Sequence, residues 1–188
     1  MSMSIFSILL IALALAMDAF AVSISSGITI ARVRVRHALL IASFFGLFQG
    51  IMPLAGWHAG LGLRTIIAGW DHWVAFLLLL AVGVKMIYDA LRPKGSEKKL
   101  DPLNLYVLFV LAVATSIDAL AVGIALAFAG VGIVLPVIVI SSVTFVTSFL
   151  GTYIGAMFGH LLEEKMEIAA GILLIGIGLK ILLQHMPA

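Results

Sequence analysis

The chain has no cysteine and few charged residues, since Asp, Glu, Lys and Arg together make up 11% of its 188 residues. Without cysteine it can form neither disulfide bonds nor thiolate metal sites. A water-soluble domain usually carries roughly a quarter charged residues, so this composition excludes an ordinary soluble domain. The net charge of only +2 gives no indication of nucleic-acid binding.

Apolar residues dominate the composition. They make up 63% of the chain, and the mean hydropathy is +1.25. A membrane-spanning helix needs about 20 mainly apolar residues. No Lys or Arg precedes the first apolar run, which favours a membrane helix over a secretory signal. We therefore predict an all-α integral membrane protein with six transmembrane helices, at residues 4–30, 38–63, 72–90, 105–129, 133–159 and 166–184.

Basic residues predict how these helices are oriented, because Lys and Arg concentrate in cytoplasmic loops. Alternate loops carry nearly all of them, whereas the opposite loops carry only Arg64. We therefore expect three cytoplasmic loops and both termini outside. The basic loop residues are Arg32, Arg34, Arg36, Arg92, Lys94, Lys98, Lys99 and Lys165.

The two halves of the sequence resemble each other. The segment "ALALAMDAFAVSI" (12–24) aligns with "AVATSIDALAVGI" (112–124), and the shared charged residue is Asp18 in one and Asp118 in the other. Near the ends of the halves, "LLLAVGVKMI" (78–87) aligns with "LLIGIGLKIL" (173–182). Three spans per half force opposite orientations. We therefore predict two inverted three-helix repeats, a recurrent transporter architecture, at 1–92 and 104–188, joined by a cytoplasmic connector at 93–103.

The two aspartates are expected halfway along their spans, where a charge costs at least about 2.5–3.5 kcal/mol. Each must therefore be protonated, paired or exposed to a wet cavity. Pairing with Lys85 and Lys180 is the purely structural alternative, but both lysines lie near span ends, where long side chains extend to the interface. Two facing carboxylates would neutralise a divalent cation, so we favour a cation site formed by Asp18 and Asp118.

Other polar side chains at similar depth are candidates to complete this site. Thr115 lies three residues before Asp118, on the same helical face. Gln49 lies four residues before Pro53, which would free a backbone carbonyl in the middle of its span. Ser148 lies in the fifth span. The five histidines form no cluster in the sequence, which favours an oxygen-preferring ion such as Mn²⁺ over zinc or copper.

The segments "MDAFAVSI", "FGLFQGIMPLAGW", "ATSIDALAVGI" and "AGILLIGIGLKIL" resemble the MntP family of bacterial manganese efflux pumps, which is related to the LysE-type exporters. The resemblance extends from about Ser4 to Leu183. It implies a multi-pass protein of the bacterial inner membrane that exports Mn²⁺ from the cytoplasm. It also implies that Asp18 and Asp118 match the family's intramembrane aspartates. Some members carry an acidic residue in place of Gln49.

The leading hypothesis is a secondary transporter, and not an enzyme, that exports Mn²⁺ with possible proton coupling. The ion would bind to Asp18, Asp118, Gln49, Thr115 and Ser148, with Mn²⁺ as substrate and no permanently bound cofactor. Three alternatives stay open: export of another cation or a cationic amino acid, a membrane structural protein with a buried ion-pair network, and a membrane metalloenzyme. No His/Glu catalytic pattern supports the last. The expected partners are the divalent ion and the lipid bilayer, and the oligomeric state is left open.

Overall fold

A computed structural model describes residues 3–30, 32–64 and 102–158, together with single residues between 73 and 88 and at 172 and 175. Each helix defined in these ranges is long and apolar enough to cross a membrane. Their bounds are Ile5–Thr29 (α1), Val35–Arg64 (α2), Leu105–Phe128 (α4) and Val134–Phe158 (α5). The first, second, fourth and fifth predicted spans are therefore confirmed as helices to within three residues at each end.

The third and sixth predicted spans lie outside the described ranges, apart from single residues. So does most of the connector. Lys85 and Lys180, the proposed structural partners of the aspartates, lie there too.

Local chemistry explains where several helices begin and end. The Ser4 side chain accepts a hydrogen bond from the Ser7 N–H at the start of α1, and Asn104 caps α4 in the same way. Such caps satisfy N–H groups that the first helical turn leaves without partners. At the end of α4, Gly130 adopts a φ of 68°, which glycine reaches without steric cost. The Val131 N–H then bonds the Leu126 carbonyl at 3.0 Å, closing a Schellman turn into α5.

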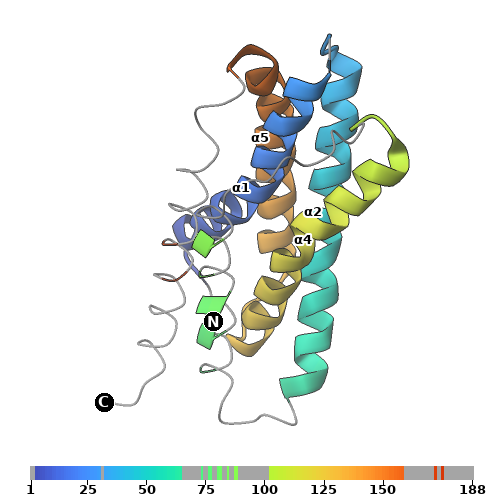
Figure 1. Ribbon diagram of the computed structural model, residues 1–188. Coiled ribbons are helices and arrows are strands. Elements are labelled where there is room, and N and C mark those ends of the chain that lie inside the picture. Colours follow the sequence, from blue (N-terminus) through green and yellow to red (C-terminus); the bar gives the residue numbers. More distant parts are fainter. Residues whose placement is uncertain are drawn as a thin grey trace.

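The four described helices run in two opposite directions (Figure 1). In Figure 1, α1 and α5 run towards the upper end of the view, whereas α2 and α4 run towards the lower end. The loop that carries Arg32 and Arg34 therefore lies at the same end as the start of α4 and the end of α5. The end of α2 and the α4–α5 turn lie towards the other end, whereas α1 begins about half-way along the bundle (Figure 1).

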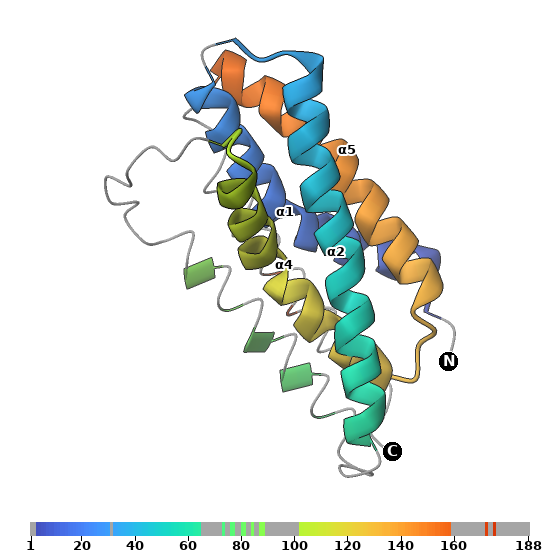
Figure 2. The same ribbon diagram turned by 90° about the vertical axis from the view of Figure 1, so that its right-hand side faces the viewer.

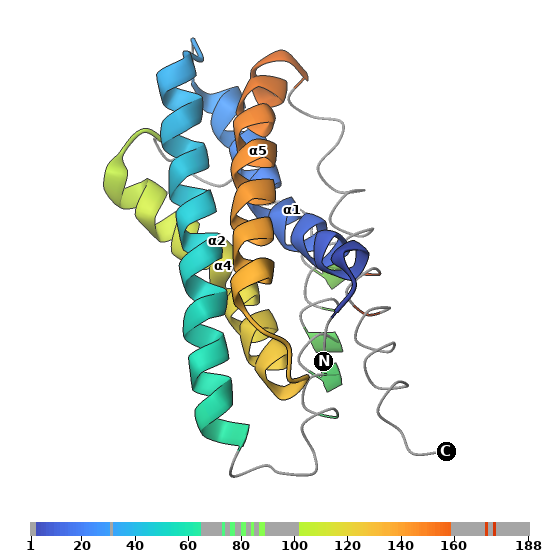
Figure 3. The same cartoon turned by 180° about the vertical axis from the view of Figure 1, so that it is seen from behind.

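The helices pack in pairs that join the two halves. α1 packs mainly against α5, α2 packs mainly against α4, and α2 and α5 meet in the middle. Figure 3 shows α2 and α5 side by side, with α1 and α4 inclined across them, and Figure 2 shows the same four helices from the side. By contrast, α1 and α2 are consecutive in the chain but touch little.

Glycines allow the two main pairs to approach backbone to backbone. A Cβ atom added at Gly155 of α5 would overlap the Ile24 carbonyl of α1, and one added at Gly56 of α2 would overlap the Leu120 carbonyl of α4. Small residues of this kind are the usual means of close helix packing in membranes, where lipid provides no hydrophobic drive. The glycine pattern in the second and fifth spans therefore positions α2 on α4 and α5 on α1.

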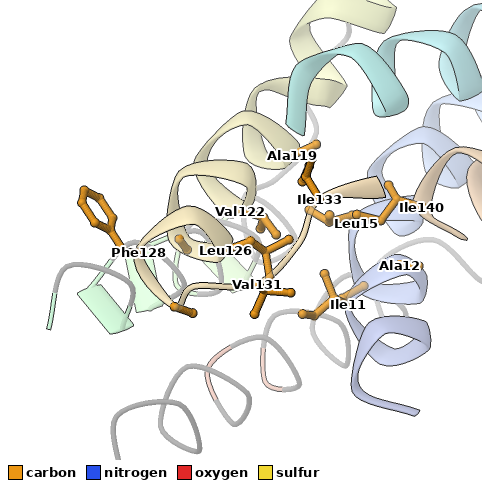
Figure 4. Close-up of a cluster of buried hydrophobic side chains, with 13 residues drawn as sticks. Ile11, Ala12, Leu15, Ala119, Val122, Leu126, Phe128, Val131, Ile133 and Ile140 are labelled. Atoms are coloured by element: carbon orange, nitrogen blue, oxygen red, sulfur yellow. The ribbon is translucent and has the colours of Figure 1, made fainter. Parts of the chain in front are cut away.

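The core of the described residues has two apolar clusters. Figure 4 shows the first, in which Leu15 from α1, Ala119 and Val122 from α4 and Ile140 from α5 gather beside the α4–α5 turn. The second is built around Ala19, Ala112 and Phe45. Large apolar side chains elsewhere on the helices are exposed, as expected for surfaces that face lipid; they include Leu9, Leu47, Phe109 and Ile138.

Candidate metal site

Gln49 connects α1 and α4 through their backbones. Its side chain is fully buried, and its Nε2 atom donates to the Leu15 carbonyl at 3.0 Å and to the Thr115 carbonyl at 3.3 Å. The two acceptors lie 100 residues apart, which is the separation of the aligned aspartate segments. A glutamine of α2 therefore joins corresponding positions on the first helices of the two halves.

The aspartates lie three residues after these two carbonyls. Asp18 follows Leu15 on α1 and is partly buried, and Asp118 follows Thr115 on α4 and is 5% exposed. A helical carbonyl points along the helix towards the N–H four residues later, so each carbonyl lies at the level of its aspartate. The Gln49 amide consequently meets α1 and α4 at the depth of both carboxylates.

Thr115 contributes its backbone to this arrangement. Its hydroxyl donates to the Ala112 carbonyl of its own helix at 3.2 Å, a local bond that is common for threonine in membrane helices. The hydroxyl oxygen keeps lone pairs with which it could contact a cation. The feature of Thr115 that the structure places beside Gln49 is its carbonyl oxygen.

Thr144 and Ser148 differ from the other hydroxyl residues of the described helices. Both are fully buried, and within the described part of the chain neither hydroxyl oxygen has a hydrogen-bond partner. They lie four residues apart on one face of α5. By contrast, seven other hydroxyls bond a carbonyl of their own helix, namely those of Ser23, Ser26, Thr29, Thr115, Ser116, Thr147 and Thr152.

The Gln49 Oε1 atom is a third buried oxygen of this kind. It is buried, and among the described residues it has no hydrogen-bond partner. A buried polar atom without a partner costs about 1–3 kcal/mol, and such atoms in a native structure call for an explanation such as an ion or a functional role. Three neutral oxygens, from Gln49, Thr144 and Ser148, thus carry this cost on the neighbouring helices α2 and α5.

Thr144 does not belong to the predicted set of ligands, although its hydroxyl is buried in the same way as that of Ser148. It lies 95 residues after Gln49, the separation that relates the aligned ends of the two halves. The same separation relates Gly56 to Gly151 and Gly60 to Gly155. Applying this offset to Gln49 identifies Thr144, so the signal was present in the sequence.

The remaining predicted ligands belong to the same region of the fold. Asp18 lies on α1 and Asp118 and Thr115 lie on α4, the two helices whose backbones the Gln49 amide contacts. Ser148 lies on α5, which packs against both α1 and α2. Among the described residues, no group of three or more His, Cys, Asp or Glu side chains gathers to hold a metal.

Comparison with known proteins gives a consistent result. Residues 32–182 match the sequence profile of a family described as "Putative manganese efflux pump". Proteins described as "Putative manganese efflux pump MntP" include one from Rippkaea orientalis, 52% identical over 93% of both chains. Another, from Methanosarcina acetivorans, is 52% identical over 98% of both chains. A relative from Clostridium perfringens is 46% identical over 97% of this chain and 96% of its own. No solved structure matches.

Proposed function

The chain belongs to the MntP family of manganese efflux pumps, and on this premise we propose that it exports Mn²⁺ from the cytoplasm through a site between Asp18 and Asp118. One observation carries the proposal. The Gln49 amide donates to the Leu15 and Thr115 carbonyls, each three residues before one of the two aspartates. Two carboxylates neutralise the charge of Mn²⁺, and oxygen ligands suit this ion.

Neutral oxygens would complete the coordination of the ion. Mn²⁺ favours octahedral surroundings built from carboxylate, carbonyl and water oxygens. We propose that Gln49 Oε1 and the hydroxyls of Thr115 and Ser148 take part, as the sequence predicts, and we add Thr144. Support comes from the buried oxygens of Gln49, Thr144 and Ser148, which have no hydrogen-bond partner in the described part of the chain.

We propose two inverted three-helix repeats as the architecture that transports the ion. Pairs of contacts related by offsets of 100 and 95 residues support this proposal. Gly56 packs on the Leu120 carbonyl as Gly151 packs on the Phe20 carbonyl. The two apolar clusters correspond in the same way, with Ala12, Ala119 and Ile140 in one and Ala112, Ala19 and Phe45 in the other.

Transport would follow by alternating access, in which two helix bundles move about a central site. The predicted topology places the basic loops in the cytoplasm and both termini outside. In the proposed mechanism the carboxylates release the ion outside the plasma membrane and return carrying protons, so that proton entry drives export. Asp18 and Asp118 suit this exchange because a carboxylate binds either a metal ion or a proton.

Metal flux into everted membrane vesicles tests the proposal directly. The wild-type protein should accumulate Mn²⁺ inside such vesicles, and Asp18→Asn and Asp118→Asn should each abolish accumulation while the protein remains folded in the membrane. Asp101→Asn, in the predicted connector, serves as the matched control and should transport normally. Unchanged Mn²⁺ flux in both intramembrane variants would contradict the assignment of Asp18 and Asp118 to the ion site.

Competition experiments in the same vesicles separate the alternatives. If Ca²⁺ or a cationic amino acid inhibits Mn²⁺ uptake at a concentration below that of the Mn²⁺ present, and itself accumulates in the vesicles, the protein exports that substrate instead. If neither Mn²⁺ nor any competitor moves, and if Asp118→Asn only lowers thermal stability, the aspartates are structural.

A further inference from the structure

We infer that Gln49 is a positioning residue, whose amide sets the separation of the two aspartate-bearing helices through their backbones. This inference rests on the proposed function, because it assigns to Gln49 the task of spacing the carboxylates of Asp18 and Asp118. It goes beyond a ligand role for Gln49, since the group that acts is the NH₂ donor and its partners are backbone carbonyls.

The chemistry of the two partners fixes the orientation of the Gln49 amide. The Leu15 and Thr115 oxygens are both hydrogen-bond acceptors. Only the NH₂ end of an amide can donate to two acceptors, and the carbonyl end would repel both. Nε2 therefore faces α1 and α4, which directs Oε1 away from these two carbonyls. Gln49 can thus hold the two helices and still present an oxygen elsewhere.

The separation of α1 and α4 depends on few other direct contacts. α1 packs mainly on α5, and α4 mainly on α2, so these two helices touch each other little. The buried clusters to which both helices contribute include small residues such as Ala12, Ala19, Ala112 and Ala119. Small side chains permit several separations of two helices, whereas two hydrogen bonds to a single nitrogen atom permit a narrow range of distances.

Pro53, four residues after Gln49, lies at a close contact between α2 and α4 that helps to hold Gln49 in place. Pro53 lies inside α2 and has no N–H, so the backbone carbonyl of Gln49 lacks its usual helical donor. Gly123 of α4 packs directly on the Pro53 backbone. α2 and α4 are therefore in close backbone contact one helical turn after Gln49. The bond to Thr115 lies within this packed pair, and the bond to Leu15 extends it to α1.

The spacing of α1 and α4 affects how strongly the site would bind an ion. Metal affinity depends on holding ligands close to the required positions before the ion arrives. Because the amide meets both helices at the level of Asp18 and Asp118, it keeps the carboxylates at one spacing in the metal-free protein. Without the donor, the ion would have to draw the helices to that spacing itself, and its affinity would fall.

Distance measurements in metal-free protein test the inference without relying on transport. The chain has no cysteine of its own, so nitroxide labels can be placed at Leu13→Cys on α1 and Ile117→Cys on α4. Both side chains are exposed on the lipid-facing surface. Pulsed electron paramagnetic resonance should give a narrow distance distribution in the labelled parent. Gln49→Met, which keeps the length of the side chain but removes the donor, should broaden it.

Affinity and control variants complete the experiment. Calorimetry should show Mn²⁺ binding to Gln49→Met at least about tenfold more weakly than to the parent, because the variant loses two hydrogen bonds and also the proposed ligand Oε1. Gln49→Asn, too short to reach both carbonyls, should give a smaller change of the same kind and serves if the methionine variant does not fold. Ser23→Ala removes an equally buried hydroxyl that bonds only its own helix, and should alter neither quantity.

The outcomes separate this inference from the proposed function. An unchanged distance distribution in Gln49→Met overturns the positioning role, whatever the affinity does. A broadened distribution with unchanged Mn²⁺ affinity also overturns it, because helix spacing would then not matter to the ion. If the labelled parent itself does not bind Mn²⁺, the proposed function fails, and the distance data still decide whether Gln49 holds the helices.

Discussion

Leu15 and Thr115, 100 residues apart in the chain, present their backbone carbonyls to the same nitrogen atom of Gln49. Each carbonyl precedes an aspartate by three residues. At this point α1 and α4 both come within hydrogen-bonding distance of one side chain of α2. A polar side chain buried at such a point fixes how two helices meet, which apolar packing alone does less specifically.

The close backbone contacts of the glycines predict a large effect of a single methyl group. Gly155→Ala would place a Cβ atom on the Ile24 carbonyl of α1, so α1 and α5 must separate. We expect the free energy of unfolding to fall by about 1–3 kcal/mol, the usual cost of overpacking. Thermal unfolding in detergent measures this change.

Gly62→Ala is the matched control for that substitution. No heavy atom lies within 4 Å of the Cβ position at Gly62, and alanine favours a helix over glycine by about 0.5–1 kcal/mol. The control should therefore leave stability unchanged or raise it slightly. Equal destabilisation by both substitutions would show that the α1–α5 contact is not the cause.

The unpartnered hydroxyl of Thr144 predicts opposite effects on stability and on ion binding. Thr144→Val keeps the shape of the side chain and removes a buried polar atom that lacks a partner in the described structure. We expect the metal-free protein to gain about 1 kcal/mol, while Mn²⁺ binding measured by calorimetry weakens. This pattern is typical of a site that is kept polar at the expense of stability.

Thr152→Val provides the comparison for Thr144→Val. Thr152 is equally buried, but its hydroxyl donates to the Ser148 carbonyl at 2.9 Å. Its removal should give no gain in stability and no change in Mn²⁺ affinity. A gain in stability at Thr144 without any loss of Mn²⁺ affinity would mean that its hydroxyl takes no part in the site.

The central α2–α5 interface can be tested with an introduced disulfide. A Cβ atom at Gly50 would lie 3.4 Å from the Ser141 Cβ, close to the Cβ separation of 3.5–4.5 Å found in disulfides. Gly50→Cys combined with Ser141→Cys should therefore cross-link on mild oxidation, as a mobility shift after proteolysis between the two halves would show. If alternating access requires α2 and α5 to shift, oxidation should stop Mn²⁺ flux and reductant should restore it.

Each single cysteine variant serves as the control, and oxidation should leave its flux unchanged. Failure of the double variant to cross-link would contradict the packing of α2 on α5 itself. Cross-linking with undiminished flux would instead show that these two helices move as one body during transport.

An indole hydrogen bond connects α2 to the α4–α5 turn and predicts a smaller effect. Trp57 Nε1 donates to the Val131 carbonyl at 2.9 Å, and Val131 also closes the turn around Gly130. Trp57→Phe should lower the free energy of unfolding by about 1 kcal/mol, measured by thermal unfolding. Trp73→Phe changes an exposed tryptophan and should have no comparable effect.

Much of the fold could be predicted from local sequence. The four described helices agree with the predicted spans because length and hydropathy are properties of contiguous residues. Asp18 and Asp118 could be selected because a carboxylate in an apolar span is rare and costly. Gln49 could be selected for a related reason, since a central amide is difficult to bury without partners.

The role of Gln49 could not be predicted in the same way. Its partners are backbone carbonyls, and every residue has one, so no residue type marks Leu15 or Thr115 as an acceptor. The lack of a partner for the Thr144 and Ser148 hydroxyls among the described residues was equally hidden, because serine and threonine in membrane helices usually bond their own helix. Only the contrast with neighbours such as Thr147 and Thr152 distinguishes them.

The sequence by itself determined that this is a membrane protein, where its described helices run and which carboxylates lie within them. These properties depend on the free energy of transferring each segment from water to lipid, which is a sum over local residues. The tertiary structure decided that α1 pairs with α5 and α2 with α4, so that the halves are interleaved. It also decided that one amide joins both aspartate-bearing helices. Both depend on close approach between distant backbones, which glycines permit but do not specify.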